Sequence, residues 1–157
     1  MTELIQEKLN AALIDAEQSY YRLILVVGES GSGKTPVLRS FAKQQNTEVI
    51  NLNRELSERL LGLTLKQRET QLISIIDDIL RPKSDPIIMD NIELLFDVNL
   101  HNDPLRVLKN LSRHRTIFAS WNGVVSQGLL NYAAPPHGEY REYSPSDICV
   151  LEMKNRP

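Results

Sequence analysis

Short apolar runs alternate with amphipathic segments along the chain. Five of the runs predict strands, at 22–27, 47–52, 86–90, 115–120 and 147–151. Segments with apolar residues at helical spacing predict helices over 3–18, 34–45, 53–61 and 64–81, and a further helix from 103 onward. Strands that alternate with helices are typical of a parallel sheet covered on both faces. We therefore expect a three-layer α/β fold around a mostly parallel, five-stranded sheet.

Polar residues mark where two of the predicted helices begin and end. Asn53 has a side chain suited to an N-cap, and the helix after it would carry Leu61 on its apolar face and stop at Gly62. Thr64 and Gln67 have the spacing of a capping box, which opens another helix. The region between the second and third strands is therefore predicted to be a pair of helices.

The C-terminal part of the chain has a different character. Residues 128–132 are apolar enough for a further strand, and 133–146 are rich in proline, tyrosine and charged residues. The length of 157 residues fits one domain with a substantial core. We expect a single domain over 1–157, with an N-terminal helical part at 1–20 and a variable part at 128–157.

A glycine-rich segment follows the first predicted strand and opens the next helix. It fits the pattern GxxxxGK[ST], and its residues are Gly28, Glu29, Ser30, Gly31, Ser32, Gly33, Lys34 and Thr35. Glycines let backbone N–H groups turn toward an anion, and the helix N-terminus adds the positive end of its dipole. Lys34 is suited to the β- and γ-phosphates and the Thr35 hydroxyl to Mg²⁺. The segment predicts a phosphate loop that binds a nucleoside triphosphate, with Pro36 removing one neighbouring backbone donor.

Other polar residues follow predicted strands and suit the same site. Asp90 has the form of a Walker B aspartate, which holds Mg²⁺ beside the loop threonine. Asn91 stands where many ATPases of the AAA+ type carry a glutamate base, and an amide orients a water but cannot take its proton. Glu93 is the nearest carboxylate and the preferred base, and the alternative is a solvated residue in the first turn after the strand. Ser120 and Asn122 are candidates to contact the γ-phosphate or the water. Any hydrolysis is expected to be slow.

Basic residues gather toward the end of the helix predicted from 103 onward. They are Arg106, Lys109, Arg113 and Arg115. One interpretation is a solvated helix face that complements the helix dipole. The other is an arginine finger that reaches a neighbouring subunit's nucleotide, for which Arg113 and Arg141 are the candidates.

Composition and charge narrow the expected environment. The chain is 41% hydrophobic and 24% charged, and its net charge of −2 provides no overall basic field for nucleic acid or a membrane. The single cysteine, Cys149, excludes an intramolecular disulfide and any multi-cysteine metal site. The first residues lack the apolar region of a signal peptide, and no run approaches the ~20 apolar residues that span a bilayer. We expect a cytoplasmic protein without a membrane partner.

Several phrases of the sequence are similar to one family. They are the phosphate loop, 51–61 (NLNRELSERLL), 89–96 (MDNIELLF), and shorter stretches at 103–106, 111–113 and 140–143. In these segments the chain resembles the BrxF family, small P-loop proteins of the BREX systems that defend bacteria against phage. The resemblance implies an AAA+-like core in an intracellular bacterial protein that acts with other BREX components on foreign DNA. It also implies nucleotide and metal binding by Lys34, Thr35 and Asp90.

The expected core leaves no residues for a helical lid after its last strand. Part of the nucleotide would then be exposed unless another chain covers it, so we expect a homo-oligomer or a complex with other BREX proteins. The favoured function is an ATP-binding assembly or regulatory component with slow hydrolysis at most. The alternatives are a small autonomous kinase, for which Arg54, Arg59 and Arg68 are suitably placed, and a nucleotide-regulated DNA-binding protein.

Overall fold

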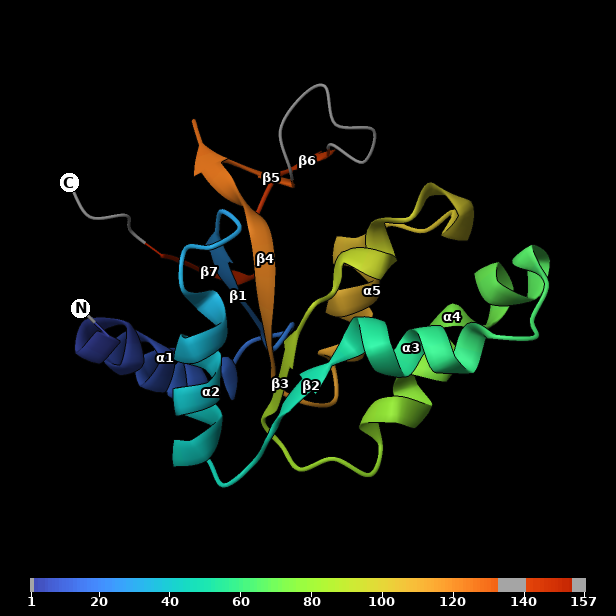
Figure 1. Ribbon diagram of the computed structural model, residues 1–157. Coiled ribbons are helices and arrows are strands. Elements are labelled where there is room, and N and C mark those ends of the chain that lie inside the picture. Colours follow the sequence, from blue (N-terminus) through green and yellow to red (C-terminus); the bar gives the residue numbers. More distant parts are fainter. Residues whose placement is uncertain (1, 133–140, 154–157) are drawn as a thin grey trace.

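The computed structural model describes residues 2–132 and 141–153. Its helices are α1 (Thr2–Ala16), α2 (Lys34–Gln44), α3 (Leu52–Leu60), α4 (Leu65–Leu80) and α5 (Pro104–Leu111), with 3₁₀ turns η1 (Glu93–Phe96) and η2 (Val98–Leu100). Its strands are β1 (Leu23–Gly28), β2 (Val49–Asn51), β3 (Ile87–Asp90), β4 (Ile117–Ser126), β5 (Leu129–Tyr132), β6 (Arg141–Tyr143) and β7 (Cys149–Glu152), as Figure 1 shows. Within these residues, no helix has both the length and the apolar character needed to cross a bilayer. Much of the predicted loop at 133–146 lies outside the described residues.

Five parallel strands form the centre of the structure, in the order β2-β3-β4-β1-β7. This arrangement confirms the predicted parallel core. At the end of β1, Gly28 lies opposite Asn122 of β4, and at the end of β2, Asn51 lies opposite Asp90 of β3. Because parallel strands all end at the same edge of a sheet, the polar residues that follow them meet there.

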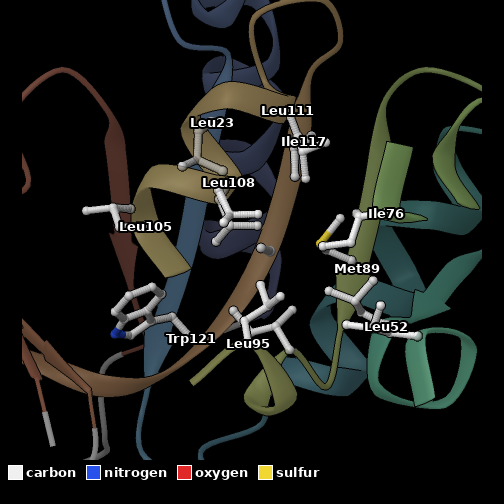
Figure 2. Close-up of a cluster of buried hydrophobic side chains, with 14 of the residues drawn as sticks. Leu23, Leu52, Ile76, Met89, Leu95, Leu105, Leu108, Leu111, Ile117 and Trp121 are labelled. Atoms are coloured by element: carbon white, nitrogen blue, oxygen red, sulfur yellow. The ribbon is translucent and has the colours of Figure 1, made fainter. Parts of the chain in front are cut away.

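Two groups of helices cover the two faces of this sheet. Figure 1 shows α1 and α2 on one side, and α3, α4 and α5 on the other. Along β1, Ile24 and Val26 belong to the cluster with α1 and α2, whereas Leu23, Leu25 and Val27 belong to the larger cluster on the opposite face. Every residue of β1 is buried, because both of its faces are covered, and this explains its continuous apolar run. Figure 2 shows part of the larger cluster.

Strand β4 continues beyond the parallel sheet. Its first six residues pair with β1, whereas Gly123–Ser126 pair antiparallel with β5, which in turn pairs with β6. Gln127 and Gly128 connect β4 to β5 with φ of 53° and 76°, the positive values of a tight two-residue hairpin. We call β4 from Gly123 onward, together with β5 and β6, the hairpin arm. The strand predicted at 128–132 is confirmed, and the arm adds two antiparallel strands to the core.

The beginning and end of α3 differ from the prediction. Asn51, not Asn53, is the N-cap, because its side-chain oxygen accepts a hydrogen bond from the Arg54 N–H. The extended backbone that a cap requires ends with the short strand β2, so Asn53 already lies within the first helical turn. Leu61 is 74% exposed because the helix stops one residue before it. The capping box that Thr64 opens is confirmed.

Candidate functional site

The phosphate loop curls between β1 and α2. Gly31 and Gly33 have φ of 82° and 97°, a left-handed conformation that glycine adopts without a steric penalty. Within the curl, the Ser32 N–H donates to the Glu29 carbonyl at 3.0 Å. Gly33 is the N-cap of α2, so the free N–H groups of the first helical turn belong to the loop. This is the backbone arrangement that binds phosphate at helix N-termini.

Lys34 is the cation of the loop and is only 7% exposed. Its ammonium group donates to the carbonyls of Gly28 and Glu29 at 2.7 and 2.8 Å. Burial lowers the pKa of Lys34, and the carboxylates of Asp90 and Glu93 offset part of this effect. The lysine therefore lies across its own loop, within reach of an anion bound in the curl.

Asp90, at the end of β3, links the phosphate loop to β4. The Thr35 hydroxyl donates to its Oδ2 at 2.6 Å, while the Ser120 hydroxyl and the Asn91 N–H donate to its Oδ1. Asp90 is 8% exposed, so these donors compensate a largely buried carboxylate. A hydroxyl and a carboxylate side by side fit Mg²⁺, which takes few protein ligands and completes its shell with water and phosphate oxygens. The residues expected to hold Mg²⁺ are therefore in contact.

Glu93 is the first residue of η1, which begins soon after β3. Asn53 donates to its Oε1 at 3.2 Å from α3, and Asn122 donates to its Oε2 at 3.3 Å from β4. Burial and the Asp90 charge raise the pKa of Glu93, while the Asn53 amide partly opposes that rise. A carboxylate held between two amides and kept more basic than usual is suited to take a proton from water.

Asn53 also contacts the site, although the sequence indicated only a helix cap at this position. Besides donating to Glu93, its Oδ1 accepts the Leu94 N–H at 2.7 Å, and its own N–H donates to the Asn91 carbonyl at 2.8 Å. Asn91 has a φ of 55°, a left-handed conformation that asparagine tolerates better than most residues. The chain thus turns sharply after β3, and this turn brings Glu93 back toward the phosphate loop.

One cavity brings most of the predicted site residues together. Its volume is about 470 Å³, and its lining residues are Ser30, Gly31, Gly33, Lys34, Thr35, Pro36, Asp90, Asn91, Glu93 and Asn122. The predicted metal and catalytic residues and five of the eight loop residues therefore line one space, whereas Gly28, Glu29 and Ser32 do not line it. The Ser120 hydroxyl donates a hydrogen bond to Asp90, but Ser120 does not line the cavity.

Met153, directly after β7, supports the phosphate loop. Its N–H donates to the Val27 carbonyl at 2.7 Å. A Cβ added to Gly28 would collide with the Ser32 side chain and lie 3.0 Å from the Met153 Cβ. Gly28 therefore leaves room for Ser32 within the loop and for Met153 beside it, and no local sequence signal announces the contact with Met153.

The two candidate finger arginines lie outside the cavity of their own chain. The Arg113 guanidinium lies 3.5 Å from the centre of the Tyr20 ring, and its Nε donates to the Tyr20 carbonyl at 3.2 Å. Arg113 precedes β4, so it lies at the edge of the sheet opposite the phosphate loop. Arg141 begins β6 and donates to the Phe96 carbonyl at 3.5 Å.

Neither a protein family nor a curated protein matches the chain by sequence. Among solved structures, C. elegans PCH-2 matches with a TM-score of 0.53 and 16% identity, over 99% of this chain and 43% of that one. A structure of Drosophila ORC bound to DNA matches with a TM-score of 0.48 and 21% identity, over 96% and 42%. The chain thus spans less than half of these neighbours. The likeness to PCH-2 shows the fold alone, the expected AAA+-like α/β fold, and no helical lid domain accompanies it in the described part of this chain.

Proposed function

We propose that this chain binds ATP with Mg²⁺ and serves as a nucleotide-dependent assembly or regulatory component of a BREX phage-defence complex, with low intrinsic hydrolysis. The observation that carries the nucleotide proposal is the Thr35–Asp90 hydrogen bond beside the curled phosphate loop, with Glu93 in the same cavity. The BREX assignment rests on the phrases at 51–61 and 89–96 in the sequence.

In this proposal the loop backbone and Lys34 bind the phosphates. The Lys34 ammonium, now shared by two loop carbonyls, moves to oxygens of the β- and γ-phosphates when the nucleotide enters. Mg²⁺ held by Thr35 and Asp90 would neutralise charge on the same phosphates. Asp90 would hold the cation or its bound water in place of the hydrogen bond from Thr35, and the Ser120 and Asn91 donors would keep the carboxylate oriented.

Glu93 is the proposed base, and its surroundings explain a low rate. Asn53 and Asn122 both donate to its oxygens, so each amide stabilises the carboxylate against accepting a proton. Asn122 is the last β4 residue that pairs with β1, and in this proposal its amide orients a water between Glu93 and the γ-phosphate. Asn91 lines the cavity without providing a base. The two amides therefore hold Glu93 in place while they lower its readiness to take a proton.

A second chain is proposed to complete the site. Neither Arg113 nor Arg141 lines the cavity, so a finger arginine would come from another copy or from another BREX protein. Contact with DNA, directly or through such a complex, belongs to the same proposal. Salt-dependent DNA binding that is lost after charge reversal at Arg106 would support direct contact.

The test combines binding with turnover. Calorimetric ATP titration with Mg²⁺ is expected to show binding that Lys34→Ala abolishes, while Lys43→Ala, which removes an exposed lysine from the same helix, leaves it unchanged. Glu93→Gln is expected to keep binding and to lose turnover. Turnover per subunit that rises with protein concentration supports a site completed by a second copy. Equal ATP affinity of the Lys34→Ala and unmodified chains would refute the nucleotide proposal.

A second candidate is phosphoryl transfer to a small acceptor. A cavity of about 630 Å³ adjoins the first, shares Asn91 and Glu93 with it, and is also lined by Arg54. A cation beside a shared carboxylate is the arrangement that an anionic acceptor requires. Phosphorus NMR of ATP with nucleoside monophosphates checks this, with Arg54→Ala expected to reduce transfer. Release of inorganic phosphate as the only product would argue against a kinase.

A further inference from the structure

Four aromatic side chains gather where the hairpin arm meets the core. This aromatic cluster consists of Phe96 from η1, Trp121 from β4, Tyr132 from β5 and Tyr143 from β6. The rings of Phe96 and Tyr132 are stacked, with their centres 3.5 Å apart and their planes within 8° of parallel. Trp121 packs edge-on against Phe96 at 5.1 Å, and both are fully buried. Figure 2 shows the Trp121 ring among the labelled side chains of the larger cluster.

The aromatic cluster is joined to the candidate site at two points. Phe96 ends the 3₁₀ turn that Glu93 begins, so one short turn carries both residues. Trp121 is the chain neighbour of Asn122, whose amide donates to Glu93. The hairpin arm also contacts η1 directly, because Arg141 of β6 donates to the Phe96 carbonyl at 3.5 Å.

We propose that Phe96 and Tyr132 are positioning residues for Glu93, so that the hairpin arm sets the placement of the carboxylate. The proposal rests on the role of Glu93 proposed above. η1 has only four residues, and backbone hydrogen bonds from Leu95 to Ile92 and from Asp97 to Leu94, at 3.0 and 3.1 Å, overlap along it, so a displacement of Phe96 is passed on to Glu93. The two amide contacts of Glu93, at 3.2 and 3.3 Å, are at the long end of hydrogen-bonding distances, and a small displacement breaks them.

The stack also explains why the arm bears an aromatic residue at this place. Leu130 and Tyr132 are the buried side chains of β5, and Leu130 alone provides ordinary apolar cover. A flat ring parallel to Phe96 fixes the direction of that ring in addition to excluding water. Burial also raises the pKa of Tyr143 to about 12, in keeping with a largely dry environment around the cluster.

The test separates ring stacking from other roles of Tyr132. Tyr132→Leu removes the stack and keeps an apolar side chain, whereas Tyr132→Phe keeps the stack and removes only the hydroxyl. With saturating ATP and Mg²⁺, the leucine variant is expected to lose about tenfold in kcat, since small misplacements of catalytic groups have effects of this order or larger. Its calorimetric Kd for ATP should match that of the unmodified chain. The phenylalanine variant should have the same kcat and the same Kd for ATP as the unmodified chain.

Three outcomes overturn the positioning role: full kcat in Tyr132→Leu, an equal loss in Tyr132→Phe, or an unmodified chain that binds ATP without any turnover. ATP binding without turnover would leave the nucleotide-binding proposal intact, whereas absence of ATP binding would overturn the proposed function itself. Trp121, the single tryptophan, supplies a measurement that does not depend on the variants folding. Its emission should change when ATP and Mg²⁺ saturate the unmodified chain. Unchanged emission, with binding shown by calorimetry, refutes the link between site and arm.

Discussion

Gly123 lies where β4 leaves the parallel sheet, and we predict that alanine at this position destabilises the chain markedly. An added Cβ would collide with the carbonyl oxygen of Asn131, lie 2.9 Å from the Asn131 carbonyl carbon and lie 3.1 Å from the Trp121 Nε1. Asn131 is on the paired strand β5, so its backbone cannot rotate aside as a flexible side chain would. Strand β5 must therefore shift away from β4.

The size of the effect follows from what that shift disturbs. Overpacking a well-packed site costs about 1–3 kcal/mol. The shift also weakens the bonds from Trp121 Nε1 to the Asn131 carbonyl, at 3.0 Å, and from the Val124 N–H to the Asn131 side chain, at 3.2 Å. Each is worth about 1 kcal/mol. Gly123→Ala is thus expected to lower the free energy of unfolding by roughly 3 kcal/mol, which lowers Tm by ~6–12 °C at this chain length.

Thermal unfolding followed by circular dichroism and by Trp121 fluorescence measures this difference. Gly128→Ala is the matched control, because it adds a methyl group to the same hairpin arm where no atom lies within 4 Å. It introduces only the strain of an alanine at a φ of 76°, about 1 kcal/mol. The reasoning is refuted if Gly123→Ala melts with the unmodified chain, or at a higher temperature than Gly128→Ala.

Three further predictions concern the site and one helix. Thr35→Val should remove most of the enhancement of ATP binding by Mg²⁺, measured by calorimetry with and without the cation, while metal-free affinity persists. The raised pKa of Glu93 means that the ionised carboxylate destabilises the folded state at neutral pH, so Glu93→Gln should raise the free energy of unfolding there. Denaturant titrations should show that this gain vanishes below about pH 4, where Glu93 is protonated in both states. Thr64→Ala should cost ~1 kcal/mol in the same titrations by removing the cap bond to Gln67, and an unchanged midpoint would contradict it.

The parts of the fold that the sequence predicts depend on local physics. The central strands β1 and β3 and the first half of β4 are buried on both faces, so their apolar runs are continuous and easy to recognise. The phosphate loop needs glycine where φ is positive, and the observed values at Gly31 and Gly33 meet that need. Asp90 follows as a site residue because all parallel strands end at the same edge of the sheet.

The parts that could not be predicted depend on packing between distant segments. Asn51 and Asn53 are both suitable caps by residue type, and only the length of β2 decides between them. The contact of Asn53 with Glu93 requires the turn after Asn91 to fold back onto α3. Met153 lies far along the chain from Gly28, and only the pairing of β7 with β1 brings them together.

The left-handed backbone of Asn91 restricts how this site can change over evolutionary time. A glutamate at position 91 would restore the order of residues common in AAA+ ATPases, yet it would have to adopt a φ of 55°, where most side chains pay roughly 1 kcal/mol or more. Straightening the turn instead would detach the Asn91 carbonyl from the Asn53 N–H and carry Glu93 away from its amides. A glutamate at position 91 therefore carries backbone strain unless the turn and its asparagine partners change with it.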